Sequence, residues 1–302
     1  MTASDEQTAL SPVVPWSFLA IGQDEVSEND CRCVVLPIPY DSTSSYMTGC
    51  KEGPNAIIDA SRYLEDYDIE LQREIYKIGV LTLPEMEAHV GSPEQMIARV
   101  KSFVQPYAQR GKLLAVLGGE HSISVGVVSA VKEVYEDISV LYLDAHGDLR
   151  DEYMGSKFSH ACSARRICEM CPIVQVGVRS ISSEEMDFVR ANNLNVNFHS
   201  ESTKRDSWDL DKIFAGLSKR VYISIDLDVF DLGLMPSVGT PEPGGLEWSS
   251  VLSLIKAICE HREVVGFDIT ELCPRAGSTY SSFVAAKLAY KVIGYATQRN
   301  ME

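Results

Sequence analysis

Residues 139–148 read SVLYLDAHGD, an apolar run that ends abruptly in charged residues. A short apolar run without polar alternation predicts a strand that is buried on both faces, as in a parallel sheet covered by helices. Ligands of such sheets bind beyond the carboxyl ends of the strands. The acidic and imidazole side chains after residue 143 are therefore candidates for a functional site.

The rest of the chain repeats this alternation of strand and helix. We predict strands at 34–37, 76–81, 112–117, 139–143, 173–176, 195–198, 221–225 and 263–267. We predict helices at 56–66, 94–109, 122–135, 161–169, 183–192, 209–215, 248–260 and 281–296. This order predicts an α/β fold of three layers, α/β/α, around a central, mainly parallel eight-stranded sheet.

Local signals support the element boundaries and the domain organisation. Ser92 before Pro93, and Ser182 three residues before Glu185, are typical helix caps. Because no linker or repeat interrupts the pattern, residues 31–302 are predicted to form a single domain. An irregular arm at 1–30 precedes it.

The composition excludes several classes of protein. With 302 residues, 45% of them hydrophobic and 23% charged, the chain has the composition of a globular protein with a substantial core. Its net charge of -16 disfavours nucleic acid and anionic membranes as partners. We expect a soluble, cytoplasmic protein, since we find neither a membrane-length apolar run nor a secretory signal pattern. The eight cysteines are expected to be reduced thiols, including Cys168 and Cys171, a CxxC without a second pair.

Three predicted strand ends carry acidic or imidazole side chains. They read GGEHS at 118–122, DAHGD at 144–148 and SIDLD at 224–228. Alternate residues of an extended chain face the same way, so the charged side chains of each segment gather on one side. One such segment alone is often a solvated loop or a helix cap, and a lone His121 would more often belong to a core. When three such segments lie together, their charged side chains repel one another and lose hydration unless a cation neutralises them. Their combination therefore favours a metal site.

The candidate donors outnumber the needs of one ion. They are two imidazoles and four carboxylates: His121, Asp144, His146, Asp148, Asp226 and Asp228. This set suits two ions with bridging aspartates, and its carboxylates favour Mn²⁺ over a structural zinc. Two such ions activate a bridging water as a hydrolytic nucleophile. Since two divalent ions only balance four aspartates, the added hydroxide favours a cationic substrate, which Glu271 would bind in bidentate fashion.

These motifs resemble those of the ureohydrolases, the family of arginase and agmatinase. GGEHS, DAHGD and SIDLD match the three metal motifs of the family in order and spacing, and GTPEPGG at 239–245 resembles a later motif. The resemblance runs from about residue 33 to residue 298 and implies an arginase-like fold. Leu232, where the family commonly has proline, and Glu120, where aspartate is commoner, leave the proposed ligands intact.

The resemblance implies a role for each site residue. Asp144 and Asp226 would bridge the two ions. His121 and Asp148 would complete the shell of one ion, and His146 and Asp228 that of the other. Glu271 would orient the guanidinium group for attack by the bridging hydroxide. His160 would shuttle a proton to the leaving amine, although a loop imidazole is also often structural. Asp148 is counted among the catalytic residues as well as the ligands.

The substrate stays open at this point. Arginases follow DAHxD with asparagine and serine, whereas residues 149–155 read LRDEYMG, with no asparagine before His160. This segment resembles the agmatinase branch, so we expect a small cationic guanidino substrate. Agmatine, hydrolysed to putrescine and urea in polyamine biosynthesis, is favoured, and Asp151 or Glu152 would attract its distal amine. The alternatives are N1-aminopropylagmatine, a guanidino acid such as guanidinobutyrate held by Arg150 or Arg179, and more distantly formimidoylglutamate.

The sequence disfavours two other kinds of protein. Zinc deacetylases share the broad fold but have paired histidines, and this sequence has no adjacent histidines. A catalytically silent relative, which only binds a ligand or serves as a subunit, is disfavoured by the complete set of ligands. Because family members are commonly trimers or hexamers, we expect a homo-oligomer.

Overall fold

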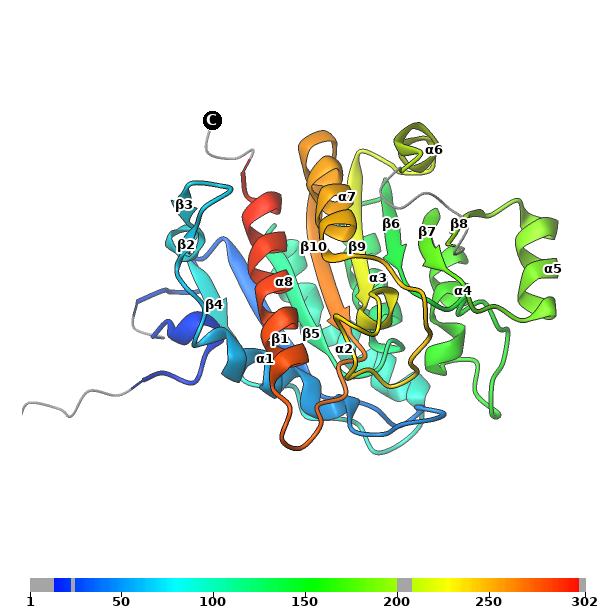
Figure 1. Cartoon of the computed structure of the whole chain (residues 1–302), viewed down its shortest axis with the longest axis horizontal. Coiled ribbons are helices and arrows are strands. Elements are labelled where there is room, and N and C mark those ends of the chain that lie inside the picture. The colour runs from blue at the N-terminus through cyan, green and yellow to red at the C-terminus, as the bar shows by residue number, and fades with distance from the viewer. Residues whose placement is uncertain (1–13, 23–24, 200–207, 299–302) are drawn as a thin grey trace, which may run out of the picture.

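The computed structural model describes residues 14–22, 25–199 and 208–298 (Figure 1). Residues 1–13 and 23–24 of the predicted arm lie outside this range, as do residues 200–207 and 299–302 of the predicted domain. Within the arm, Phe18 is fully buried in the hydrophobic core. Across the described ranges, no helix is both long and apolar enough to cross a membrane.

Eight parallel strands form the central sheet. In chain order they are β1 (Cys33–Ile38), β4 (Val80–Thr82), β5 (Leu113–Gly118), β6 (Ile138–Leu143), β7 (Ile173–Val178), β8 (Asn195–Phe198), β9 (Arg220–Asp226) and β10 (Glu263–Thr270). Across the sheet they lie in the order β4-β1-β5-β10-β9-β6-β7-β8, and each neighbouring pair is parallel. The predicted mainly parallel eight-stranded sheet is confirmed.

Helices cover both faces of the sheet. One face packs against α1 (Gly53–Ser61), α6 (Leu210–Ala215), α7 (Trp248–His261) and α8 (Tyr280–Ala296). The other packs against α2 (Pro93–Gln109), α3 (Ile123–Val134), α4 (Ser163–Cys168) and α5 (Ser183–Asn192). Figure 1 shows α7 and α8 in front of the sheet and α2 and α3 behind it. The three-layer α/β/α architecture is therefore confirmed.

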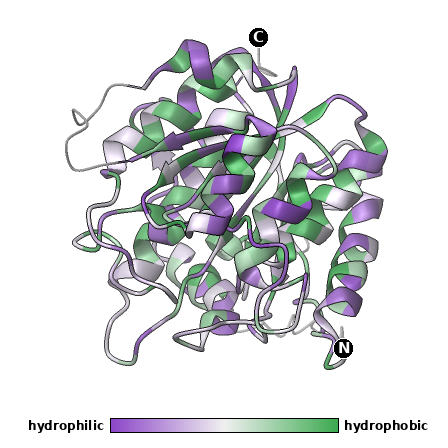
Figure 2. Cartoon of the chain, turned by 90° about the vertical axis from the view of Figure 1, so that its right-hand side faces the viewer, coloured by the Kyte–Doolittle hydropathy of each residue, from purple (hydrophilic) through white to green (hydrophobic). Residues whose placement is uncertain are grey.

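Each face of the sheet contributes side chains to a separate hydrophobic core. Val35 and Leu117 belong to one core, whereas their neighbours Leu36 and Val116 belong to the other. Successive strand residues point to opposite faces, so a strand between two helix layers must be apolar throughout. The helices mix hydrophilic and hydrophobic residues along their length, as expected when only one side meets a core (Figure 2).

The predicted helix caps are also confirmed. The Ser92 side chain accepts from the Gln95 N–H, and the Gln95 side chain accepts from the Ser92 N–H, so the two residues form a capping box at the start of α2. Ser182 and Glu185 form the same arrangement at the start of α5. Each box satisfies N–H groups that have no partner inside the helix.

The predicted strand at 76–81 is wrong over most of its length. Ile75–Ile78 form a 3₁₀ helix, and β4 begins only at Val80. Gly79 has a φ of +80°, which interrupts an extended chain. The Ile75 side chain is fully buried, and its N–H donates to Tyr290 Oη of α8 at 3.2 Å, so a tertiary contact overrides the β-branched pattern.

The predicted helix at 56–66 is displaced toward the amino terminus. The observed α1 spans Gly53–Ser61, because Pro54 is tolerated in its first turn. Beyond the helix the chain forms a short antiparallel hairpin that the sequence did not predict, β2 (Tyr67–Asp68) with β3 (Arg73–Glu74). The buried Lys291 of α8 holds this hairpin by donating to both Asp68 oxygens, at 3.1 and 3.0 Å.

Four adjacent strands carry the sequence motifs. In the order β5-β10-β9-β6, they lead into GGEHS, the segment with Glu271, SIDLD and DAHGD respectively. Because the strands are parallel, all four carboxyl ends lie at the same edge of the sheet. The topology thus brings together residues that are far apart in the sequence, such as His121 and Glu271, which are separated by 150 positions.

Candidate metal centre and active site

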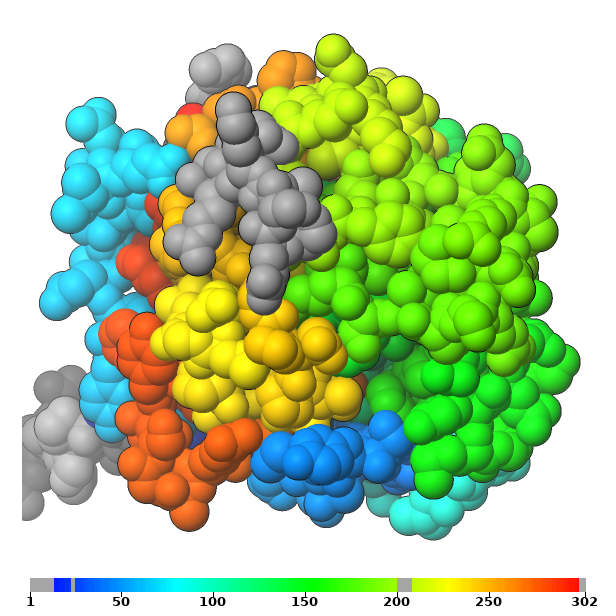
Figure 3. Space-filling view, turned by 45° about the vertical axis from the view of Figure 1, so that its right-hand side comes forward, coloured from blue at the N-terminus to red at the C-terminus, as the bar shows by residue number. Residues whose placement is uncertain are grey.

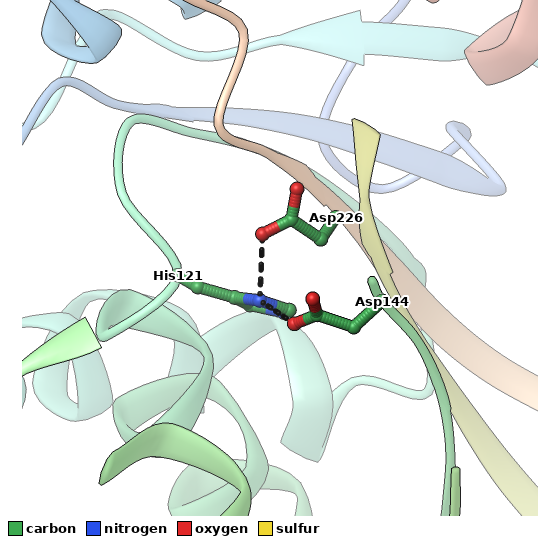
Figure 4. A group of neighbouring side chains, drawn as sticks. All are labelled: His121, Asp144 and Asp226. Atoms are coloured by element: carbon green, nitrogen blue, oxygen red, sulfur yellow. Dashed lines mark ion pairs between the residues drawn. The ribbon is translucent and has the colours of Figure 1, made fainter. Parts of the chain in front are cut away.

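The first group of candidate ligands surrounds the imidazole of His121. Asp144 Oδ2 lies 3.0 Å and Asp226 Oδ2 3.2 Å from His121 Nδ1. Figure 4 shows both carboxylates directed at this one ring nitrogen. One donor atom from each of the three residues lies within 4.8 Å of the others, close enough to hold one metal ion.

A second group lies beside the first and shares a member with it. Asp144, His146 and Asp228 also bring donor atoms within 4.8 Å of one another. The His146 Nδ1 atom lies 2.8 Å from Asp228 Oδ2 and 3.6 Å from Asp144 Oδ1. Two groups that share a carboxylate match the expected pair of ions with a bridging aspartate.

Backbone N–H groups hold three of the aspartates in place. His146 N donates to Asp144 Oδ1 at 2.6 Å, Asp228 N to Asp226 Oδ1 at 2.8 Å, and Ala145 N to Asp228 Oδ1 at 3.0 Å. In each case Oδ1 is engaged and Oδ2 faces an imidazole. The chain thereby fixes each carboxylate and leaves one oxygen directed at the site.

Asp148, the sixth predicted ligand, lies beside the first group. Its Oδ2 atom is 3.6 Å from His121 Nδ1 and accepts a hydrogen bond from Tyr142 Oη at 2.8 Å. Its φ of +50° is unusual for a residue with a side chain. The structure thus brings all six predicted ligands together, with Asp148 outside the two tight groups.

Further residues orient the His121 ring, and sequence reasoning missed them. Tyr142 stacks on it with ring centroids 4.4 Å apart. The His121 Nε2 atom lies 2.9 Å from Ser224 Oγ, which donates to Asp268 Oδ1 at 2.8 Å. The contact at Nε2 fixes the ring so that Nδ1, which lies 3.0 Å from Tyr142 Oη, faces the carboxylates. Ser224 opens SIDLD, and Asp268 occupies the matching position of the adjacent strand β10, which was the available signal.

The electrostatics of the site fit a cation. Burial alone would lower the pKa of His121 and of His146, but the neighbouring aspartates outweigh it and raise both. Burial and adjacent carboxylates also raise the pKa of Asp226 and of Asp148. Among the described residues, the buried Asp144 Oδ2 accepts no hydrogen bond. An unsatisfied carboxylate oxygen among carboxylates and imidazoles suits divalent metal ions.

Glu271 is buried at the carboxyl end of β10. Its Oε1 accepts from His121 N at 2.8 Å, and its Oε2 accepts from the Cys50 thiol at 3.3 Å. Burial and the nearby charge of Glu120 raise the pKa of Glu271 to about 7. A carboxylate held this way gains stabilisation from a cation that enters beside it.

His160 lines the same cavity, at the end of a loop. The backbone N–H of His160 donates to Thr43 Oγ1 at 2.9 Å, and the ring atom Nε2 lies 3.2 Å from Ser45 Oγ. Burial, with the neighbouring imidazoles, lowers the pKa of His160. Glu120 in turn accepts from Thr43 N at 2.6 Å. No pattern in the sequence indicated that the loop after β1 supports His160.

A cavity of about 400 Å³ lies over these residues. Its wall includes Ser45, His160, Tyr153 and Glu242, together with the imidazoles of the two ligand groups. Figure 3 shows a hollow where the blue segment near residue 45 meets the green segment near residue 155 and the yellow-orange segment near residue 242. The carboxyl edge of the sheet is therefore accessible to a small ligand here.

The four charged residues that the sequence suggested for substrate recognition differ in whether they line the cavity. The Arg179 guanidinium donates to backbone carbonyls, including that of Asp228 at 2.6 Å, and does not line the cavity. Asp151 pairs with Arg166 at 2.6 Å, away from the cavity wall. Glu152 is exposed, whereas Arg150 does line the cavity. Arg179 and Asp151 thus stabilise the framework, and Arg150 is the one of these four residues that lines the cavity.

Comparison with known proteins agrees with this geometry. The arginase family matches residues 31–294. The N(1)-aminopropylagmatine ureohydrolase of Synechocystis sp. is 40% identical over 273 residues, which cover 88% of this chain and 89% of that protein. The agmatinase of Pyrococcus horikoshii is 38% identical, covering 89% of this chain and 93% of that one. The chain belongs to the arginase family.

A solved structure extends this assignment to the whole fold. The agmatine ureohydrolase of Thermoplasma volcanium superposes with a TM-score of 0.83 at 33% identity, and the match covers 99% of each chain. The arginase family depends on binuclear metal centres, and the two donor groups that share Asp144 fit such a centre. The predicted class, a ureohydrolase that cleaves guanidino groups, is therefore confirmed.

Proposed function

We propose that this arginase-family enzyme releases urea from a linear guanidino polyamine, with N1-aminopropylagmatine as the first candidate. The observation that carries the proposal is the pair of ligand groups around Asp144, in the same cavity as the buried carboxylate of Glu271. The name of the Synechocystis relative supports this substrate. Agmatine is the second candidate, supported by the Pyrococcus relative and by the segment at 149–155.

The metal is proposed to be a pair of Mn²⁺ ions. The six ligands are four carboxylates and two imidazoles, a set that suits hard divalent ions: His121, Asp144, His146, Asp148, Asp226 and Asp228. When bound, such a pair supplies a water activated as a nucleophile near neutral pH. The aspartates would hold the ions, and the backbone N–H groups around them hold the aspartates.

Glu271 is proposed to bind the guanidinium group. One oxygen accepts from His121 N and the other from Cys50, and each keeps a free lone pair for a planar cation. The incoming positive charge offsets the desolvation that raises the pKa of Glu271. Glu271 would therefore orient the guanidino carbon toward the ligand groups.

His160 is proposed to carry the proton that the leaving amine needs. Because its pKa is lowered, the imidazole is neutral at pH 7 and is able to accept a proton before passing it on. The ring itself meets Thr43 Oγ1 at Nδ1, 3.5 Å away, and Ser45 Oγ at Nε2, 3.2 Å away, so both hydroxyls hold it at the cavity wall. The ring edge meets Tyr153 at a centroid distance of 6.2 Å, which limits its rotation.

The cellular setting is proposed as well: a cytoplasmic homo-oligomer, trimeric or hexameric, that acts on small cations of polyamine metabolism and not on nucleic acid or membranes. The acidic net charge supports this choice of partners. Exposed Trp16, Tyr63 and Ile69 offer apolar surface for contact between subunits. Light scattering after size exclusion would report the number of subunits.

The proposal is tested by steady-state urea release. The protein would be loaded with Mn²⁺ and assayed on N1-aminopropylagmatine, agmatine, arginine and guanidinobutyrate. We expect the highest kcat/KM on N1-aminopropylagmatine, then on agmatine. A higher kcat/KM on agmatine would make it the substrate, and binding without urea release from any of the four would show a silent relative.

A further inference from the structure

The acidic side chains that line the cavity differ in whether they already have a hydrogen-bond partner or a proposed role. Those that line it are Asp148, Asp226, Asp228, Glu185, Glu242 and Glu271. The aspartates belong to the proposed metal centre, and Glu271 to the guanidinium site. Glu185 is buried and accepts from Leu149 N at 2.9 Å and from Ser182 N at 2.8 Å. The Glu242 side chain, by contrast, makes no hydrogen bond or ion pair with any described residue.

The backbone beneath Glu242 is held firmly. Arg179 donates to the carbonyls of Glu242 at 2.8 Å, Pro243 at 3.0 Å and Asp228 at 2.6 Å. These bonds tie the segment 239–245 to the end of β9, which carries proposed metal ligands. The Glu242 carboxylate is half-buried on this fixed backbone. Its charge interacts with Arg179, but no described side chain or backbone group hydrogen-bonds its oxygens, so they are available to a ligand in the cavity.

The short segment between Gly239 and Glu242 limits how far Glu242 lies from Glu271, the proposed guanidinium site. A Cβ at Gly239 would lie 2.8 Å from Glu271 Oε2, so the segment touches Glu271 there. Glu242 follows three residues later, which places its Cα at most about 11 Å from that of Gly239. Four methylene groups, with carbon–carbon bonds of about 1.5 Å, cover much of this distance, and the glutamate side chain covers the rest.

We propose that Glu242 is a specificity residue, which binds the substrate ammonium that lies four methylene groups from the guanidino group. The inference rests on the proposed function and deepens it. Agmatine carries a primary ammonium at this position, and N1-aminopropylagmatine carries a secondary one, so one carboxylate recognises both. The substrate class is therefore a guanidine with a distal cation and not a guanidino acid.

Arg150 is the feature that would favour the opposite class. It lines the cavity, and its guanidinium carbon lies 5.0 Å from the centre of the Tyr153 ring. This stacking engages the face of the guanidinium group. The surrounding charge is otherwise negative, which favours an ammonium over a carboxylate near the cavity wall.

The test compares two substrates on matched variants. Agmatine would be compared with pentylguanidine, in which a methyl group replaces the ammonium. In Glu242→Gln, we expect kcat/KM for agmatine to fall about tenfold, mainly through KM, with pentylguanidine unchanged. Glu242→Asp keeps the charge and should recover part of the loss. Glu260→Gln removes the same charge from an exposed position on α7, outside the cavity, and should behave like the wild type.

The outcomes separate this inference from the proposed function. Equal losses on both substrates in Glu242→Gln, or no loss on either, would overturn the role of Glu242. A tenfold loss on guanidinobutyrate in Arg150→Met, with higher wild-type activity on it than on agmatine, would overturn the substrate class. Calorimetric binding of putrescine is independent of turnover, and it should weaken about tenfold in Glu242→Gln. Absence of urea from every guanidine would instead refute the proposed function.

Discussion

Two site residues adopt backbone angles that ordinarily favour glycine. Asp148 has a φ of +50° and Glu271 a φ of +64°. Such conformations cost about 1–3 kcal/mol each and persist only where surrounding contacts impose them. For Glu271 one such contact is the hydrogen bond from its N–H to Gly119 O at 2.7 Å. Within the site, these strained backbone angles fall on two residues whose carboxylates are directed at the cavity.

The Cys50 thiol is the side-chain donor that sets the Glu271 carboxylate. Cys50→Ala should leave Glu271 Oε2 without this donor and raise KM about five- to tenfold, with the bound metal unchanged. Cys50→Ser keeps a donor of similar size and should restore KM. Steady-state kinetics and metal analysis on both variants would check this. Equal KM values for the wild type and Cys50→Ala would contradict the role of the thiol.

At the scale of elements, the hairpin β2–β3 depends on α8. Lys291 is buried and pairs with the buried Asp68 at 3.0 Å, so Lys291→Met would leave a buried charge unpaired. We expect a loss of about 3 kcal/mol in the free energy of unfolding, measured with urea. Lys256→Met is the matched control. It removes only an exposed pair with Glu70 and should cost less than about 1 kcal/mol.

An equal loss in the two lysine variants would show that burial does not decide the value of these pairs. Restoration of stability in the double variant Lys291→Met with Asp68→Asn would support the stated cause, because the unpaired charge is then removed. A loss of bound metal in Lys291→Met would contradict the separation between this contact and the site.

The sequence predicted those elements whose signals are local. Apolar runs fixed seven of the eight strands, and Ser92 and Ser182 marked two helix starts. The strand at 76–81 failed because the turn at Gly79 and the contact of Ile75 with Tyr290 are tertiary. The order of strands also depends on pairing between distant segments, which no local pattern encodes.

The same distinction holds for the site. The six candidate ligands and Glu271 could be predicted because carboxylates and imidazoles at strand ends are unusual without a function, and the structure brings them together. Thr43 and Ser45 lie in the loop after β1, and Cys50 begins a short 3₁₀ helix (Cys50–Glu52). Neither segment has such a pattern, so the sequence did not predict them. Only the folded chain shows that Thr43 N donates to Glu120 and that Cys50 reaches Glu271.

At the scale of the whole molecule, the folded chain concentrates negative charge at one edge of the sheet. Without metal, the raised pKa values of His121 and His146 mean that both rings hold protons at pH 7. Metal ligation needs neutral rings, so Mn²⁺ binding should release protons and its affinity should rise with pH. Calorimetry in two buffers of different ionisation enthalpy would measure this release. Affinity independent of pH between 6 and 8 would contradict it.

The central claim is that six side chains from three strand ends hold two metal ions around Asp144. Its most direct test is a crystal of the manganese-loaded protein, measured at the manganese absorption edge. We predict two anomalous peaks per subunit, one contacting His121 Nδ1 and the other His146 Nδ1, with Asp144 touching both. A single peak, or peaks away from these residues at saturating Mn²⁺, would contradict the account.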